Sequence, residues 1–323
     1  MAPTSASRSS TGGEGYGAER RCRRIGRYPV RRRAYRRLSQ GCRGASLAEL
    51  FPSAGGPALR WVTHQGRELL LVEHPRCRAV FSRQGAQLLH FQPSGDRPWL
   101  WCASRWQPHG PIRGGVPICW PWFGRHPTES GWPSHGWARL SDWQLVSGEV
   151  HGQGVSLRWR LELCDWQVTL EAELGERMAL RLVTRHADSE PCRLSHALHA
   201  YWRVGDVARV ALLGLEGAPG YDLLSRGDCL QQGGLRIEDG CHRIFRRAGE
   251  LQLLDLEWQR RLLLDTAGGA NTVVWHPGSR PLTDVGWNEA LGFLCVEAAS
   301  CGPDSLSLQA GEQGVLRLHA RRG

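Results

Sequence analysis

The chain has 323 residues, of which 41% are hydrophobic and 22% charged, a composition typical of a globular protein with a sizeable core. This composition excludes a collagen-like repeat and a wholly disordered chain. No stretch approaches the roughly 18 uninterrupted apolar residues of a membrane-spanning helix. We therefore expect no membrane association, and the length allows one large β domain or two smaller domains.

The formal net charge of +10 comes from the first 45 residues, which hold 12 Arg against two acids, Glu14 and Glu19. The remainder is balanced, with 29 basic and 29 acidic residues. We expect residues 1–57 to form a basic, low-complexity arm that is disordered, because the basic segment lacks apolar periodicity and is rich in Gly and Ser. A nucleic-acid or membrane-surface tail and a transit peptide are the alternatives.

The eleven Cys residues are scattered, and none forms a C-x-x-C motif. Their odd number and irregular spacing argue against a disulfide framework and against a zinc ribbon. We expect most of them to be small buried residues in a reducing compartment, which is consistent with the cytoplasm. No metal site is predicted.

From about residue 58 onward the chain is predicted to form strands, because apolar and polar residues alternate between Gly- and Pro-containing turns. Alternation with period two indicates one buried and one exposed face, as in antiparallel sheets. No long segment shows helical periodicity, so residues 58–323 are predicted to form one large, all-β antiparallel sandwich. The predicted strands are Arg67–Glu73, Val155–Leu163, Trp166–Leu174, Met178–Val183, Leu251–Trp258, Arg261–Asp265, Thr272–Trp275, Gly292–Glu297 and Gly314–His319.

Tryptophan is unusually frequent: the chain has fifteen, and eight lie between Trp99 and Trp143. One interpretation is core packing, and the other is a carbohydrate cleft in which aromatic faces stack on sugar rings. Cationic and imidazole side chains in the same stretch suit a sugar that bears an anion. These side chains are Arg113, Arg125, Arg139, His109, His126 and His135.

Three segments carry candidate chemistry. In residues 112–124 the paired Gly114 and Gly115 let the backbone approach a ligand closely, or form a rigid Gly/Pro connection. In residues 195–206 His199 shares a strand face with Tyr201, where it is either catalytic or structural. In residues 292–299 Glu297 ends an apolar strand, where a carboxylate is either functional or turned to solvent.

Together these segments resemble the hexose-6-phosphate mutarotases, or glucose-6-phosphate 1-epimerases, of the aldose 1-epimerase superfamily. Several motifs in register carry the resemblance, and they span roughly residues 60–320. The matching pieces are RGGVPICWPWFG at 113–124, HGWAR at 135–139, ALHAYWRVGDV at 197–207, GLEG at 214–217, TVVWHPG at 272–278 and FLCVE at 293–297.

The resemblance implies a galactose mutarotase-like β-supersandwich whose cleft interconverts the α and β anomers of hexose 6-phosphates, most of all glucose 6-phosphate. It implies that His199 is the general acid and Glu297 the general base. The reaction has no redox step, so no cofactor and no metal are expected. We expect a cytoplasmic monomer that binds a small phosphosugar and no nucleic acid.

The resemblance also places substrate-binding residues. It assigns Arg113 and Arg139 to the substrate and its phosphate, Asp222 to sugar hydroxyls, and His135 to the same cleft. The chain departs from the family pattern at Ala200, at His276 and at the position two residues before Asp222. Three alternatives stay open: a non-catalytic carbohydrate-binding or sensing protein, a mutarotase for unphosphorylated aldoses, and nucleic-acid binding through residues 1–45.

Overall fold

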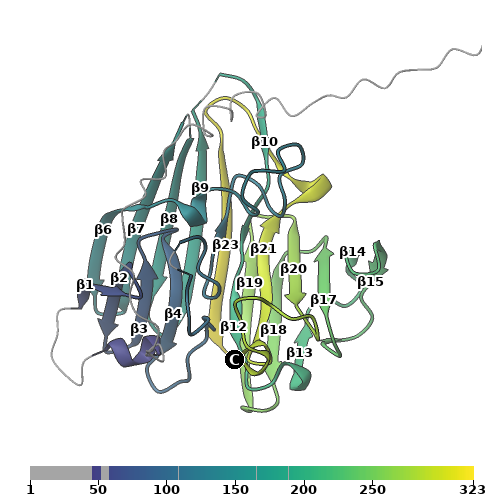
Figure 1. Ribbon diagram of the computed structural model, residues 1–323, viewed down its shortest axis with the longest axis horizontal. Coiled ribbons are helices and arrows are strands. Elements are labelled where there is room, and N and C mark those ends of the chain that lie inside the picture. The colour runs from purple at the N-terminus through teal and green to yellow at the C-terminus, as the bar shows by residue number, and fades with distance from the viewer. Residues whose placement is uncertain (1–45, 52–57, 108, 165, 188) are drawn as a thin grey trace, which may run out of the picture.

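Two large antiparallel sheets packed face to face form the body of the chain (Figure 1). The computed structural model describes residues 46–51, 58–107, 109–164, 166–187 and 189–323. This arrangement confirms the predicted all-β sandwich. The nine-stranded sheet has the order β16-β13-β18-β19-β23-β9-β8-β7-β6. Its strands are β6 (Gln144–His151), β7 (Gly154–Leu163), β8 (Trp166–Leu174), β9 (Met178–His186), β13 (Val210–Leu213), β16 (Leu235–Arg236), β18 (Gly249–Asp255), β19 (Arg260–Ala267) and β23 (Gln313–Arg322).

The second, eight-stranded sheet has the order β15-β14-β17-β20-β21-β11-β5, with β12 also paired to β21. Its strands are β5 (Ile118–Cys119), β11 (His196–Leu198), β12 (Tyr201–Arg203), β14 (Pro219–Asp222), β15 (Gly227–Leu230), β17 (Cys241–Phe245), β20 (Asn271–His276) and β21 (Phe293–Ser300). β21 lies inside this sheet, so it is hydrogen-bonded on both edges.

Smaller elements complete the fold. A four-stranded sheet runs in the order β1-β2-β3-β4, and β10 pairs with β22. Among the described residues the only α-helix spans four residues, and none is long and apolar enough to cross a membrane. These elements are β1 (Leu59–His64), β2 (Arg67–His74), β3 (Cys77–Ser82), β4 (Gln87–Pro93), β10 (Cys192–Leu194), β22 (Leu306–Leu308), α1 (Trp287–Ala290), and the 3₁₀ turns η3 (Leu47–Leu50), η4 (Ala138–Leu140), η5 (Val207–Arg209) and η6 (Gly302–Asp304).

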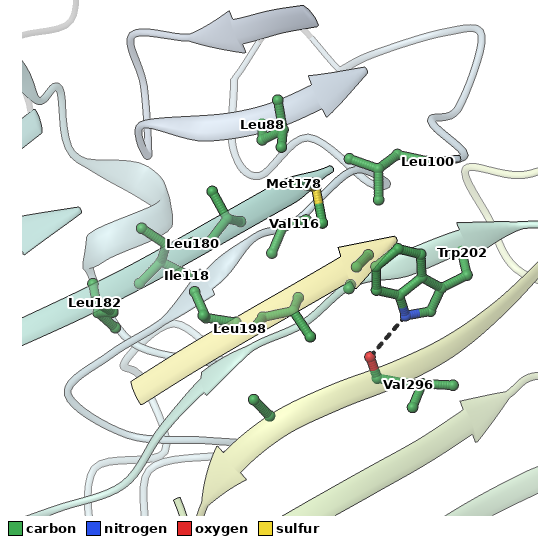
Figure 2. Packing of buried hydrophobic residues seen from close by; sticks show 14 of the residues in the cluster. Leu88, Leu100, Val116, Ile118, Met178, Leu180, Leu182, Leu198, Trp202 and Val296 are labelled. Carbon is green, nitrogen blue, oxygen red and sulfur yellow. Dashed lines mark hydrogen bonds between the residues drawn. The ribbon is translucent and has the colours of Figure 1, made fainter. Parts of the chain in front are cut away.

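The main core fills the space between the sheets (Figure 2). On the nine-stranded side, alternate residues of β7, β8 and β9 point inward, as their period-two pattern predicts. Facing the nine-stranded sheet are Leu198, Trp202 and Val296 of the eight-stranded sheet and Phe81 of the four-stranded sheet, whose ring stacks on Trp159 of β7. The indole Nε1 of Trp202 donates a hydrogen bond to the Val296 carbonyl oxygen at 3.0 Å, so this buried polar group is satisfied.

β21 is buried on both faces along its whole length. Leu294, Val296 and Ala298 face the core between the sheets, and the alternate residues pack under loops and aromatic side chains on the outer face. This double burial explains the continuous apolar run in its sequence. It also puts Glu297 on the outer face.

All nine predicted strands are present, and most of them begin or end at a different residue from the prediction. β21 continues to Ser300, so Glu297 lies within the strand and the prediction that it ends the strand was wrong. The pairing of β21 with β11 and β20 extends past Glu297 and explains the added length. The strand predicted over 251–258 ends at Asp255, because residues 256–259 turn into β19.

Part of the predicted N-terminal arm is described. Residues 46–51 include η3, and Leu47, Leu50 and Phe51 pack against a buried cluster of the four-stranded sheet. The guanidinium of Arg78 lies 5.3 Å from the Phe51 ring centroid. Residues 1–45 and 52–57 lie outside the described residues, so the disordered arm stays a prediction.

Candidate active site

His199 and Glu297 meet on the outer face of the eight-stranded sheet. β11 and β12 both pair with β21, and the two stretches share one register. Residues 199 and 200 lie between β11 and β12, and the same register applied to them places His199 opposite Glu297. The imidazole Nδ1 lies 3.2 Å from Glu297 Oε1. The backbone N–H of His199 donates to the Pro117 carbonyl oxygen at 3.0 Å, which ties this point of the chain to the 112–124 segment.

Both side chains are deeply buried, with 1% of the Glu297 side chain and 10% of the His199 side chain exposed. Burial raises the pKa of Glu297 well above its ordinary value. Burial also lowers the pKa of His199 well below its ordinary value, and the positive charges of Arg139 and Arg113 and the nearby His135 add to that effect. Both shifts favour the neutral forms of the pair, protonated Glu297 and unprotonated His199.

Aromatic rings hold the imidazole in place. The ring of Tyr201 stacks on that of His199 at 4.9 Å between centroids, with 7° between the planes. The Trp275 ring lies 6.2 Å from His199 and packs edge-on against it. Sequence reasoning did not assign a role to Trp275 or to the stacking of Tyr201. The shared strand face of His199 and Tyr201 was the available signal for the second.

His135 lines the same place. Its ring centroid lies 5.6 Å from that of His199. Burial, with the positive charges of Arg139, His242 and Arg113, lowers the pKa of His135 to about 3, so the imidazole is neutral near pH 7. Its Nδ1 accepts the Gly124 N–H at 3.3 Å, which leaves the proton on Nε2 as a hydrogen-bond donor.

Arg113 and Arg139 supply the positive charge near this pair. Arg113 Nε lies 2.7 Å from Asp284 Oδ2, and its Nη1 lies 3.4 Å from the Tyr201 hydroxyl. Arg139 Nη2 donates to the Ser134 carbonyl oxygen at 2.6 Å, and its Nε is buried without a hydrogen-bond partner among the described residues. Within the described part of the chain no ion pair joins Arg139 to a carboxylate.

The glycine pair after Arg113 is a packing feature. Both glycines have positive φ, 113° at Gly114 and 62° at Gly115. A Cβ on Gly114 would come within 2.3 Å of Cys102 Cα, and one on Gly115 within 2.1 Å of the Leu88 carbonyl oxygen. The backbone rather than a ligand occupies this space, which favours the rigid-connection interpretation of the segment.

Asp222 lies apart from the His199–Glu297 pair. Its Oδ2 lies 2.8 Å from Arg243 Nε, and its Oδ1 accepts the N–H groups of Leu224 and Ser225. In the β14–β17 pairing Asp222 lies opposite Arg243. Cys241 and Phe245, two positions before and after Arg243, face the core, so Asp222 and Arg243 lie on the core side of the sheet. Its predicted contact with sugar hydroxyls stays a prediction.

The tryptophan-rich segment is mainly structural. Trp99, Trp120 and Trp143 are fully buried in the core between the sheets. Trp122 and Trp132 stack on each other at 5.3 Å in the loop before η4. The indole in ring contact with His199, Trp275, comes from β20, outside this segment. Core packing is therefore the better interpretation for most of the cluster.

A metal site is not evident in the described residues, where no group of three or more His, Cys, Asp or Glu side chains is arranged to hold an ion. The described polar groups of the site instead include two imidazoles, two guanidiniums, the buried Glu297 carboxylate, the Asp284 carboxylate and the Tyr201 hydroxyl. This set can bind a polar ligand and transfer protons.

Comparison with known proteins agrees with this fold. Residues 68–320 match the model of the aldose 1-epimerase family. A protein of Escherichia coli K12 named "Putative glucose-6-phosphate 1-epimerase" is 30% identical over 249 residues, which cover 72% of this chain and 83% of that one. A Salmonella typhimurium protein of the same name is 31% identical over 247 residues, covering 71% and 82%.

Among solved structures, a crystal structure titled as a "putative mutarotase" from Salmonella typhimurium superimposes with a TM-score of 0.77 at 26% identity. The match covers 83% of this chain and 94% of that chain. The fold and the family resemblance seen in the sequence are thereby confirmed. The chain belongs to the aldose 1-epimerase family, and its activity is that of an isomerase of the mutarotase type.

Proposed function

We propose that this protein interconverts the α and β anomers of hexose 6-phosphates, with glucose 6-phosphate as the main substrate. The observation that carries the proposal is the 3.2 Å contact between His199 and Glu297 at a buried site that also holds positive charge. The names of the bacterial relatives support the choice of a phosphosugar.

Anomer exchange requires the anomeric hydroxyl to lose a proton while the ring oxygen gains one. In the proposed reaction the Glu297 carboxylate accepts the hydroxyl proton, and protonated His199 donates to the ring oxygen. The ring opens to the free aldehyde, and rotation about the first carbon–carbon bond presents the other face of the carbonyl. Closure reverses both proton transfers, so the enzyme returns to its starting state.

The shifted pKa values make each group more reactive in its proposed role, while they lower the share of the pair that is ionised before the reaction. Burial raises the pKa of Glu297, which makes its carboxylate a stronger base. The pKa of His199 is lowered by burial, so its protonated form is a stronger acid. The stacked Tyr201 ring holds the imidazole plane, which limits the geometry in which the proton is delivered.

The phosphate is assigned to the two arginines. Arg139 has a buried guanidinium without a carboxylate partner among the described residues, and Arg113 keeps its terminal nitrogens open apart from the long Tyr201 contact. A guanidinium recognises a phosphate through charge-assisted, often bidentate hydrogen bonds. Neutral His135 can add a donor from Nε2 to a sugar oxygen.

The test is magnetization-exchange NMR on equilibrated glucose 6-phosphate and on glucose, with and without the purified protein. We expect faster exchange of the phosphosugar, and a larger loss of its kcat/KM than of glucose's in Arg113→Ala. If the protein accelerates neither sugar, the proposal fails, and binding without turnover would favour a non-catalytic binding protein. A preference for glucose would favour a mutarotase for unphosphorylated aldoses. This is the second candidate function, because Asp284 forms an ion pair with Arg113 and compensates its charge.

A further inference from the structure

Arg113 is held by a residue from a distant loop. Asp284 lies between β20 and α1, 171 residues further along the chain, and its Oδ2 accepts a hydrogen bond from Arg113 Nε at 2.7 Å. About a quarter of each side chain is exposed, 28% for Arg113 and 26% for Asp284. The pair is therefore shielded enough to be stronger than a surface ion pair.

The contact uses only one edge of the guanidinium. Asp284 takes Nε, Nη1 has the long contact with the Tyr201 hydroxyl, and Nη2 has no hydrogen bond within the described part of the chain. The edge formed by Nη1 and Nη2 is the one that can receive both oxygens of an anion. Burial alone would lower the pKa of Arg113, but Tyr201 and Asp284 together raise it, so the group stays charged.

This edge lies beside the proposed reaction centre. The Tyr201 hydroxyl contacts Arg113, while the ring of the same Tyr201 stacks on His199. A chain of contacts therefore runs from Asp284 through Arg113 and Tyr201 to the imidazole. An anionic group held on the open edge of Arg113 would be fixed relative to His199.

The loop that carries Asp284 is held near both ends by hydrogen bonds of His276, one of the positions that depart from the family pattern. Its Nδ1 accepts the Gly278 N–H at 3.1 Å, and its Nε2 lies 2.9 Å from the Ala290 carbonyl oxygen. Where the loop enters α1, Glu289 Oε2 accepts the Gly286 N–H at 3.1 Å. The loop is thus braced independently of Arg113.

Asp284 itself is incompletely satisfied. Its Oδ1 is buried and has no hydrogen-bond partner among the described residues, and leaving such an oxygen unpaired is unfavourable. Asp284 also lines a cavity of about 650 Å³ between residues 104–107 and 283–289. A carboxylate kept in this state at the boundary of a cavity needs an explanation beyond stability, because a neutral side chain would fit with less cost.

We propose that Asp284 is a positioning residue: its hydrogen bond with Arg113 Nε fixes the guanidinium, so that Nη1 and Nη2 are oriented for the anionic group of the substrate before it binds. Fixing the orientation of Nη1 and Nη2 before binding removes part of the conformational-entropy cost of binding. The effect is selective, because a neutral sugar makes no use of that edge. This inference rests on the proposed function and adds the residue that makes the Arg113 contact effective.

The experiment compares Asp284→Asn with wild type in anomer exchange of glucose 6-phosphate and glucose. We expect KM for the phosphosugar to rise about 5- to 30-fold, with kcat and both glucose parameters changing less than about twofold. Glu289→Gln is the matched control, since it removes a carboxylate from α1, at the end of the same loop, that forms no ion pair with Arg113 among the described residues. The double variant Arg113→Ala/Asp284→Asn should be no worse than Arg113→Ala alone, because the two residues act as a unit.

Equal losses for both sugars, an additive double variant, or tighter phosphosugar binding in Asp284→Asn would overturn the inference. A wild-type protein that accelerates neither sugar would instead defeat the proposed function. Calorimetric titration with inorganic phosphate separates these cases, since it needs no turnover and should show weaker binding in Asp284→Asn. Arg113→Lys is the second variant: it keeps the charge but lacks the Nε that Asp284 holds, and it should show the same selective loss.

Discussion

His199 and Glu297 stand opposite each other in a single antiparallel register, although their ladder hydrogen bonds are interrupted there. Directly opposed residues in such a pair have Cβ atoms roughly 4.5–5.5 Å apart on the same face. The 3.2 Å separation between Nδ1 and Oε1 follows from this placement. The His199 N–H points away from β21 and donates to the Pro117 carbonyl oxygen, which continues the β11–β5 register.

The first prediction concerns the pair itself. Glu297→Gln keeps the shape of the side chain but cannot accept a proton, so we expect the NMR exchange rate to fall about 10²- to 10⁴-fold. His199→Asn should cost a similar factor, and the double variant should cost little more than either one, because the two groups act in one step. An unchanged rate in Glu297→Gln, with the circular dichroism spectrum intact, would contradict the assignment.

The second prediction concerns pH. The ordinary pKa values are 4.5 for Glu and 6.5 for His, and in this site the first is raised and the second lowered. Both shifts favour the form of the pair with protonated Glu297 and neutral His199 over the ionised form that starts the proposed reaction, and the two groups titrate as a coupled pair. We expect kcat/KM to follow a bell-shaped pH profile whose two limbs belong to the pair, and the residual activity of Glu297→Gln to keep only one of them. A Glu297→Gln profile with both limbs of the wild type would show that Glu297 is not one of the titrating groups.

The third prediction tests His135 as a donor to the sugar. This residue has φ of 63°, a left-handed conformation that Asn adopts more easily than most residues. His135→Asn therefore preserves the backbone, and we expect KM to rise with kcat changed less. Trp132→Phe in the adjoining loop is a control that does not touch the pair. A fall in kcat as large as that of His199→Asn would instead make His135 part of the proton transfer.

Sequence patterns predicted the strands, and family resemblance proposed His199 and Glu297 as the pair, but neither predicted the contacts that hold these two side chains. Period-two alternation marked β7, β8 and β9 because each has one face in the core. The motifs around His199 and Glu297 identified both residues through family resemblance. The Arg113–Asp284 contact joins residues 171 positions apart, so no local pattern contains it.

The tryptophan cluster also shows that local sequence patterns do not predict where a side chain packs. Local composition suggested a sugar cleft between Trp99 and Trp143, yet Trp99, Trp120 and Trp143 are fully buried between the sheets. Which face an aromatic ring occupies depends on the strand pairing, which the sequence does not state. The sequence assigns no role to Trp275, because this residue is the only tryptophan in its segment. The pairing of β20 with β21 places it beside His199.

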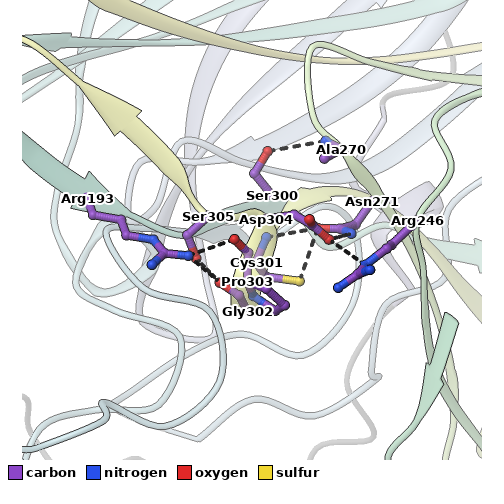
Figure 3. A network of polar contacts seen from close by, with 10 residues as sticks. All are labelled: Arg193, Arg246, Ala270, Asn271, Ser300, Cys301, Gly302, Pro303, Asp304 and Ser305. Atoms are coloured by element: carbon purple, nitrogen blue, oxygen red, sulfur yellow. Dashed lines mark hydrogen bonds and ion pairs between the residues drawn. The ribbon is translucent and has the colours of Figure 1, made fainter. Parts of the chain in front are cut away.

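The fourth prediction concerns the end of β21, which a polar network fastens (Figure 3). Asn271 Oδ1 accepts the Cys301 N–H and its Nδ2 donates to Asp304 Oδ2, both at 3.0 Å. Asn271→Ala leaves the buried Cys301 N–H unpaired, so we expect about 1–3 kcal/mol of destabilisation in urea unfolding. Arg246→Ala removes an exposed partner of the same Asp304 and should cost about 0–1 kcal/mol. Equal costs would show that Asn271 adds nothing beyond the surface ion pair.

The fifth prediction follows from the raised pKa of Glu297. A carboxyl whose pKa is higher in the folded state contributes stability below its unfolded pKa, and this contribution is lost as pH rises through the folded value. Wild type should therefore lose stability on going from about pH 5 to pH 8 relative to Glu297→Gln, whose amide does not titrate. We expect the Tm difference in favour of Glu297→Gln to grow over that range. Glu173→Gln on β8, at an exposed site, is the control for loss of one charge. A Tm difference that stays constant with pH would contradict the raised pKa.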